Sequence, residues 1–218
     1  MTRARAHNIG LSLDGFGTGV DQSLEAPFGH AGIRLMSWYF PTRTFQVQTG
    51  DRERVEVESA ADPDDVFAAR AWEGIGAEIM GAGKFGPPGW QDDPDWTGWW
   101  GDEPPFHTPV YVMTHAPRAS IEKAGGTTFH FRDAPPADVL AEASAAASGL
   151  DVRLGGGPTS IREFLAAGLV DHLHVVVVPI LLGRGVRLWD GLEGLEESYA
   201  VESVTTPSGV THVTFTRP

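Results

Sequence analysis

Glycine-rich runs that each follow an apparent strand are the first candidates for chemistry in this sequence. Gly155-Gly156-Gly157 follows a strand-like stretch at 151–154, and the helix expected after it begins with the hydroxyls of Thr159 and Ser160. Glycine lets the backbone approach a ligand closely, and a helix start presents free N–H groups and a positive dipole end. The run therefore suits a phosphate, although a tight strand-to-helix turn explains it about equally well.

A second run, Gly81-Ala82-Gly83-Lys84, also follows an apparent strand. Two such turns at the ends of neighbouring strands would form a crevice that attracts anions from both sides, as a dinucleotide requires. Lys84 is either a point charge for a phosphate or a solvated surface lysine. The Gly155-Gly156-Gly157 run does not match the spaced G-x-G-x-x-G fingerprint or a Walker loop.

A third candidate region lies at the end of the apolar run 110–114, where Thr114 is followed by Arg118. An arginine guanidinium can hold a phosphate through two parallel hydrogen bonds. An ordinary exposed arginine is equally consistent with the sequence.

The elements that must position these residues alternate between strands and helices. Apolar and alternating runs predict strands at 7–14, 77–80, 110–114, 127–131, 151–154, 174–181, 199–205 and 211–216. Helices are expected at about 66–75, 136–148 and 159–167, with one short helix near 31–40 in a long loop over 22–62. This alternation predicts parallel βαβ units closed by an antiparallel hairpin at one edge. Since no composition break divides the chain, we expect one domain over residues 1–218.

The composition excludes several classes of protein. The chain has 218 residues, 41% of them hydrophobic, and no cysteine, which favours a globular fold without disulfides or thiolate metal sites. A net charge of −13 disfavours nucleic-acid binding, so an anionic cofactor would have to be held locally. Neither a leader peptide nor a bilayer-spanning run is seen, and we expect a cytoplasmic protein without membrane contact. His172 and His174 share one side of a strand, but no spacing indicates a metal site.

The glycine runs and two further stretches of the sequence together resemble those of a known family. Ser12-Leu-Asp14-Gly15 stands near the start, and Pro179-Ile-Leu-Leu-Gly183-Arg-Gly185 stands near the end. Together with the stretch 100–109, they resemble the dihydrofolate-reductase-like superfamily over about residues 8–216. The branch is that of bacterial proteins similar to the C-terminal reductase domain of the riboflavin-biosynthesis deaminase/reductase.

The resemblance implies an NADPH-dependent reductase with an α/β three-layer sandwich, in which helices cover both faces of a mostly parallel, twisted sheet. It implies that the pyrophosphate of the cofactor is faced by Gly155, Gly156, Gly157, Thr159 and Ser160. The second phosphate side would be faced by Gly81, Ala82, Gly83 and Lys84. Thr114 and Arg118 would lie by the adenosine ribose, and Ser12 and Asp14 at the nicotinamide end.

Hydride transfer requires little acid–base chemistry beyond one proton donor. Asp14 and Ser12 are the candidate catalytic residues, although an aspartate before Gly15 is also typical of a turn. Asp14 and Trp38 are the candidate substrate contacts. An indole can stack on a flat heterocycle, or it can simply fill the core.

The chain departs from the family pattern at two places. An arginine is common in this branch where Ala82 stands, so NADH is not excluded as the cofactor. True dihydrofolate reductases bind the pterin through a carboxylate on the helix after the first loop, and the corresponding stretch 33–38 contains no acidic residue. Dihydrofolate is therefore disfavoured as the substrate.

The sequence thus predicts a reductase that transfers hydride to a pterin-like or pyrimidine heterocycle. The alternatives are the 5-amino-6-(5-phosphoribosylamino)uracil reductase of riboflavin biosynthesis, a flavin-dependent reductase and a nucleotide-binding protein without turnover. We also expect a homodimer, because the long apolar strand at 174–182 and the aromatic loops offer exposed apolar surface to a second copy of the chain.

Overall fold

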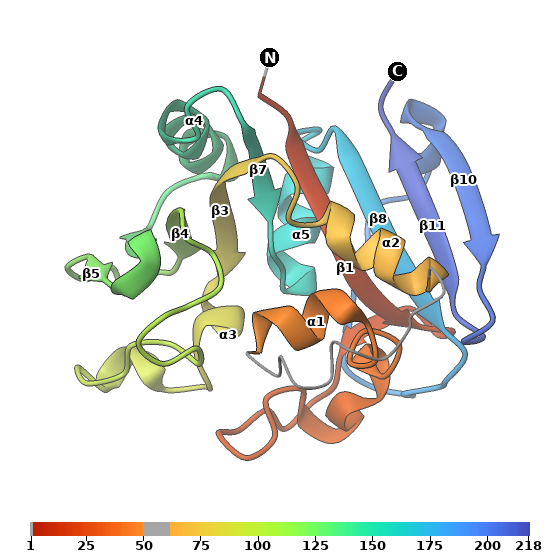
Figure 1. Ribbon diagram of the computed structural model, residues 1–218, viewed down its shortest axis with the longest axis horizontal. Helices are drawn as coiled ribbons and strands as arrows, with labels where there is room; N and C mark the ends of the chain where they lie inside the picture. Colours follow the sequence, from red (N-terminus) through yellow and green to blue (C-terminus); the bar gives the residue numbers. More distant parts are fainter. Residues whose placement is uncertain (1, 50–61) are drawn as a thin grey trace.

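One twisted nine-stranded sheet organises the computed structural model, which describes residues 2–49 and 62–218 (Figure 1). Its strands are β1 (Ala4–Ser12), β3 (Ile75–Gly81), β4 (Pro109–Met113), β5 (Ile121–Glu122), β6 (Thr128–Arg132), β7 (Asp151–Leu154), β8 (His172–Val178), β10 (Ala200–Thr205) and β11 (Thr211–Thr216). They are ordered β10-β11-β8-β1-β7-β3-β4-β6-β5. The strands from β8 to β6 run parallel, whereas β10, β11 and β5 are antiparallel to their neighbours.

Helices cover both faces of this sheet. One face carries α4 (Pro136–Ala146) and α5 (Pro158–Ala166), and the other carries the 3-10 segment η1 (Gly29–Met36), α1 (Arg43–Gln48) and α2 (Pro63–Arg70). The four-residue α3 (Ala82–Phe85) follows β3 directly. The remaining short elements are β2 (Phe16–Thr18), η3 (Trp90–Asp92), η4 (Ala124–Gly126), β9 (Val186–Arg187) and η5 (Leu195–Ser198). The predicted three-layer α/β architecture with its closing hairpin is confirmed.

Alternation along the strands sends neighbouring side chains into different layers. On β3, Ala77 and Ile79 pack with the helices α4 and α5, whereas Met80 joins an aromatic cluster on the other side. The aromatic cluster also contains Trp90. Trp38 belongs to a third hydrophobic cluster, which includes apolar side chains of η1 and α2. Because successive residues of a strand face opposite ways, Glu78 must lie on the same side as Met80.

The expected helix over 66–75 is wrong at both ends. Asp62 caps α2 by accepting a hydrogen bond from the Asp64 amide at 3.0 Å, and Pro63 begins the helix. The helix ends at Arg70, and Gly74, at a φ of 67°, leads into β3. The Gly74 carbonyl accepts a hydrogen bond from Asp151 of β7, so tertiary pairing begins the strand earlier than the apolar pattern does.

The long loop expected over 22–62 contains more structure than one short helix. Its described part holds η1 and also α1, whose first turn is capped by the buried Thr42 hydroxyl. The rest of this loop, residues 50–61, lies outside the described residues. Among the helices of the described ranges, none is long and apolar enough to cross a bilayer.

Candidate functional site

The two glycine-rich turns lie side by side at the carboxyl ends of β3 and β7 (Figure 1). The Gly155 amide donates a hydrogen bond to the Ile79 carbonyl at 2.8 Å. The Gly81 amide donates to the Gly156 carbonyl at 2.9 Å. Because each turn is hydrogen-bonded to the other segment, the two form one continuous surface at this edge of the sheet.

Gly81 also allows α5 to approach β3 closely. A Cβ atom built on Gly81 would lie 2.2 Å from the Ser160 hydroxyl oxygen, a separation that real side chains do not adopt. Ser160 is in the first turn of α5, so this glycine brings the start of α5 against the end of β3. The sequence predicted both residues as cofactor contacts; the structure gives them a packing role as well.

Two glycines of these turns face open space. Among the described glycines, only Gly83 and Gly157 have both a backbone conformation open to any residue and no atom within 4 Å of an added Cβ. Neither strain nor packing requires a glycine at these positions. A ligand that lies directly against the backbone would explain why no side chain is present at either one.

The start of α5 adds hydrogen-bond donors to the same surface. Gly157 is the N-cap and Pro158 the first helical residue, so the next amides have no partner within the helix. Thr159 is exposed, and its hydroxyl lies in the same turn. Free amides at the positive end of a nine-residue helix favour an anion.

A buried group of three charges supports the turns from below. Glu78, 1% exposed, accepts a hydrogen bond from Lys84 Nζ at 2.9 Å and forms an ion pair with Arg153, whose Nε lies 3.1 Å from a Glu78 carboxylate oxygen. The Arg153 guanidinium also lies 3.7 Å from the ring centre of Trp72. A Cβ on Gly155 would lie 2.1 Å from a Glu78 carboxylate oxygen, so this glycine permits the contact between turn and charges.

Sequence reasoning missed Glu78 and Arg153, although a signal was present. Both stand inside strands, two or three residues before a glycine run. They are paired across β3 and β7, where opposite charges attract. Burial lowers the pKa of Lys84, while Glu78 beside it acts in the opposite direction. With one carboxylate and two cations, the group carries an excess positive charge beneath the glycine turns.

Lys84 and Arg118 have other partners than the sequence suggested. Lys84 is turned towards Glu78 rather than standing free on the surface. Arg118 packs against the rings of Trp90 and Phe131 and donates to the carbonyls of Asp93 and Trp96. The expectation that Arg118 grips a cofactor phosphate is not supported by this arrangement, because the 90–96 loop already occupies its guanidinium.

Thr114 lies next to the first glycine turn, and its expected place by the adenosine ribose stays a prediction. Met113 is paired with Gly81 across β4 and β3, so Thr114 leaves the sheet beside Ala82. Its hydroxyl accepts a hydrogen bond from the Ala116 amide at 3.1 Å, which shapes the turn after β4. The residue lies at the carboxyl edge that also bears the glycine turns.

Asp14 and Ser12 organise loops at the end of β1. The Asp14 carboxylate accepts from the amides of Leu182 and Gly183 at 3.1 and 2.7 Å. A hydrogen bond from Ser12, with those two amides, lowers the pKa of Asp14 to about 2. Ser12 is buried, and its hydroxyl accepts from the Phe16 amide. The hydrogen bonds from Leu182 and Gly183 tie the loop after β8 to the end of β1, and the catalytic role of Asp14 and Ser12 stays a prediction.

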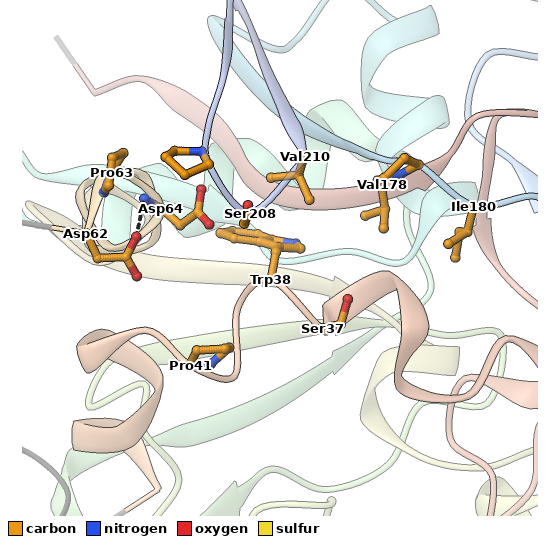
Figure 2. Close-up of a pocket in the computed structure, with 12 residues that line it drawn as sticks. Ser37, Trp38, Pro41, Asp62, Pro63, Asp64, Val178, Ile180, Ser208 and Val210 are labelled. Atoms are coloured by element: carbon orange, nitrogen blue, oxygen red, sulfur yellow. Dashed lines mark hydrogen bonds between the residues drawn. The ribbon is translucent and has the colours of Figure 1, made fainter.

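Trp38 lies apart from these residues, in the wall of a cavity of about 340 Å³ beyond β8 (Figure 2). The indole is 3% exposed and meets His212 edge to face, with ring centres 5.3 Å apart. Asp14, the other expected substrate contact, does not line this cavity. The structure therefore does not bring Trp38 and Asp14 together.

The histidines form a hydrogen-bonded chain that sequence reasoning did not find. His174 and His212 are joined at 3.0 Å between ring nitrogens, and His212 reaches Asp64 at 2.9 Å. The residues come from β8, β11 and α2, and only the strand order brings them together. Within the described ranges, no group of three or more such side chains is arranged to hold a metal ion.

The fold and the paired turns define an α/β protein with a candidate anion site at the carboxyl edge of its sheet. The chain belongs to the RibD C-terminal domain family, whose model matches residues 8–212. This match confirms the expected branch of the dihydrofolate-reductase-like superfamily. A comparison with curated proteins gives no match.

Solved structures with the same fold include three from bacteria. A riboflavin biosynthesis protein from Shewanella sp. PV-4 has 20% identity and a TM-score of 0.55, with 100% of this chain and 99% of that chain covered. A pyrimidine reductase-like protein from Corynebacterium diphtheriae has 13% identity and a TM-score of 0.52, covering 100% and 92%. RibD of Acinetobacter baumannii has 14% identity and a TM-score of 0.52, covering 100% of this chain and 58% of that one. At these identities the likeness supports the fold alone.

Proposed function

We propose that this protein is a reductase that binds NADPH on the paired glycine turns and reduces a flat heterocycle. One observation carries the proposal: Gly83 and Gly157 leave open space on a surface that the turns build jointly. When bound, NADPH supplies the hydride. The family to which the chain belongs provides the independent support.

The residues of the chain would bind and orient the two reactants. The amides of Gly156 and Gly157 and the start of α5 would hold the pyrophosphate, with Thr159 and Ser160 as hydroxyl donors. Gly81 to Gly83 would line the other side, and Thr114 the ribose. Asp14, ionised and bound to the amides of Leu182 and Gly183, would fix the loop at the end of β1.

The heterocycle is proposed to be a pterin-like or pyrimidine ring. A specific candidate is the phosphoribosylamino-uracil of riboflavin biosynthesis, which the RibD C-terminal family favours. Few cations lie in the early loops, and one of them, Arg34, donates to the Leu181 carbonyl. Comparing turnover of this compound with that of its dephosphorylated form tests whether the phosphate contributes to binding.

We also propose that the protein forms a homodimer. The edge strand β10 is exposed along its whole length and includes the apolar Val201 and Val204. An unpaired strand edge offers backbone donors and acceptors to a second chain. Sedimentation velocity tests this proposal, and a monomer at working concentration would contradict it.

The glycine turns provide the direct test of the cofactor site. We expect Gly157→Val and Gly83→Val to weaken NADPH binding by at least about tenfold, since a side chain would enter the space proposed for the cofactor. Titration followed by tryptophan fluorescence measures the affinity, and NADPH absorbance then follows turnover across a panel of heterocycles.

A matched control separates this effect from general damage. Ala145→Val adds apolar bulk on an exposed position of α4 and should leave NADPH affinity unchanged. Equal NADPH affinities in all variants would show that the cofactor does not bind at these turns. Binding without oxidation by any heterocycle would instead favour a nucleotide-binding protein without turnover, and a yellow purified protein would indicate a flavin.

A further inference from the structure

A cavity lies on the other side of β1 from β7 and its glycine turn. It has a volume of about 340 Å³, which is within the range of small-molecule sites. Trp38, Asp64 and Ser208 contribute polar atoms to its wall, and Val178 and Ile180 contribute apolar ones (Figure 2). The β10–β11 hairpin forms one wall of this cavity. In the sheet order β7-β1-β8-β11, strand β11 lies three strand spacings, or about 14 Å, from β7, which leads into a glycine turn.

The Trp38 indole presents an unused donor at this cavity. Trp38 is 3% exposed, and its Nε1 atom has no hydrogen-bond partner. Figure 2 shows this nitrogen on the side of the ring towards Val210 and Val178, away from Asp64. A buried N–H without a partner costs about 1–3 kcal/mol, so a ligand that accepts this hydrogen bond would be stabilised.

The hydrogen-bond chain fixes the protonation of the two histidines behind the cavity. The Asn8 amide donates to His174 Nδ1 at 3.3 Å, so the proton of a neutral His174 must be on Nε2. His174 Nε2 then donates to His212 Nδ1, and His212 Nε2 donates to Asp64. Each ring nitrogen has its role assigned with both rings neutral. Burial lowers the pKa of both histidines, in agreement with this assignment.

Asp64 therefore carries a negative charge that no lysine or arginine of residues 2–49 and 62–218 balances. It is 4% exposed, and it accepts from the neutral His212 and from the hydroxyls of Thr206 and Ser208. In the part of the chain that the structure describes, no lysine or arginine forms an ion pair with it. Burial raises the pKa of Asp64, but these hydrogen bonds outweigh burial and lower it, which keeps the carboxylate ionised.

We propose that this cavity binds a small planar organic cation that also bears a hydrogen-bond acceptor. The positive charge would compensate Asp64, and a carbonyl of the ligand would accept from Trp38 Nε1. The flat ring would lie between the apolar side chains of Val178 and Ile180. This site is separate from the proposed reductase site and does not depend on that proposal.

Two probes of the same shape test the role of charge. The 1-methyl-4-carbamoylpyridinium ion is planar and positively charged and has a carbonyl, and 4-methylbenzamide is the neutral molecule of the same shape. We expect isothermal titration of the full chain to give at least about tenfold tighter binding of the cation. Trp38→Phe, which keeps an aromatic ring but removes the donor, should weaken both probes several-fold.

The variant Asp64→Asn tests whether the charge of Asp64 causes the tighter binding of the cationic probe. It should bring the two affinities to within about twofold, because the negative charge is removed. Should this variant fail to fold, Trp38→Phe and the comparison of the two probes in the unchanged protein still decide the matter. Gly157→Val, which fills the other site, should not alter binding of either probe.

Three outcomes would overturn the inference. One is equal affinity for the two probes in the unchanged protein, and another is unchanged affinities in Trp38→Phe. The third is loss of cation binding in Gly157→Val, which would place the probe at the glycine turns.

Discussion

Glu78 determines the charge balance beneath the glycine turns. Its carboxylate is the shared partner of Lys84 and Arg153, and the three side chains are largely buried. We expect Glu78→Gln to destabilise the protein by about 3 kcal/mol, since two cations would remain close together without a counter-charge. Urea unfolding measures the change.

Glu142→Gln is the matched control for this substitution. It removes the carboxylate from the ion pair with Arg132, which lies on the surface, with side chains 33% and 43% exposed. A surface pair contributes at most about 1 kcal/mol, so the control should lose far less stability than Glu78→Gln. Similar losses in both variants would contradict a special role for the buried group.

Ala82 determines how well the proposed site distinguishes NADPH from NADH. An arginine is common at this position in the family, and Arg118, the other candidate, is bound to the 90–96 loop. We expect similar affinities for the two cofactors and a roughly tenfold shift towards NADPH in Ala82→Arg, since a guanidinium can pair with the extra phosphate. Competition titrations measure the ratio, and Ala82→Gln tests for an effect of size alone.

At this scale the sequence predicted backbone sites better than side-chain partners. The glycine runs and the helix start at Ser160 could be located because they have local signatures, and their role as cofactor contacts stays a prediction. Arg118 could not be placed, since its neighbours Trp90 and Phe131 come from distant segments. Trp38 lines a cavity beside the β10–β11 hairpin, which strand order and not the local sequence determines, and its contact with the substrate stays a prediction.

At the scale of elements, the histidine chain links α2, β8 and β11. The ordinary histidine pKa is 6.5, whereas burial lowers that of His7 to about 2 and that of His174 to about 3. Below pH 6.5 the unfolded chain binds protons that the folded chain does not. The stability from the neutral rings is therefore complete above that pH and is lost as the pH falls towards about 3.

We expect the free energy of unfolding to decrease on acidification by up to about 1.4 kcal/mol per pH unit for each such histidine. Urea unfolding between about pH 7 and about pH 5 measures this slope. His174→Gln should reduce it, whereas His115→Gln, at a fully exposed side chain, should not. An unchanged slope in His174→Gln would show that the buried ring is not the source.

The predicted elements were correct wherever burial and sequence pattern agree. The strand at 151–154 was placed at its observed bounds, because its apolar residues Val152 and Leu154 alternate with charged ones and glycines follow directly. By contrast, α1 was missed: it has six residues, none of them buried, so no apolar face marks it in the sequence. The end of α2 depends on pairing between Gly74 and β7, which no local pattern contains.

At the scale of the whole molecule, the strand order explains why distant segments meet. The described strands from Ala4 to Thr216 share one sheet, apart from the small β2–β9 pair. β8 contributes Val175 to the core on one face and Val176 to the core on the other. The two layers therefore cannot separate without breaking the same strands.

This sharing supports one domain over residues 1–218, which we propose on the basis of the sheet. We expect a single cooperative unfolding transition in urea, with the same midpoint by far-ultraviolet circular dichroism and by tryptophan fluorescence. The two methods report different parts, because Trp38 and Trp90 belong to different clusters while the dichroism averages over all elements. Separate midpoints would mean that the aromatic cluster around Trp90 unfolds independently of the rest of the sheet. In that case the glycine turns, which begin at β3 next to that cluster, would lose their support before the remaining strands unfold.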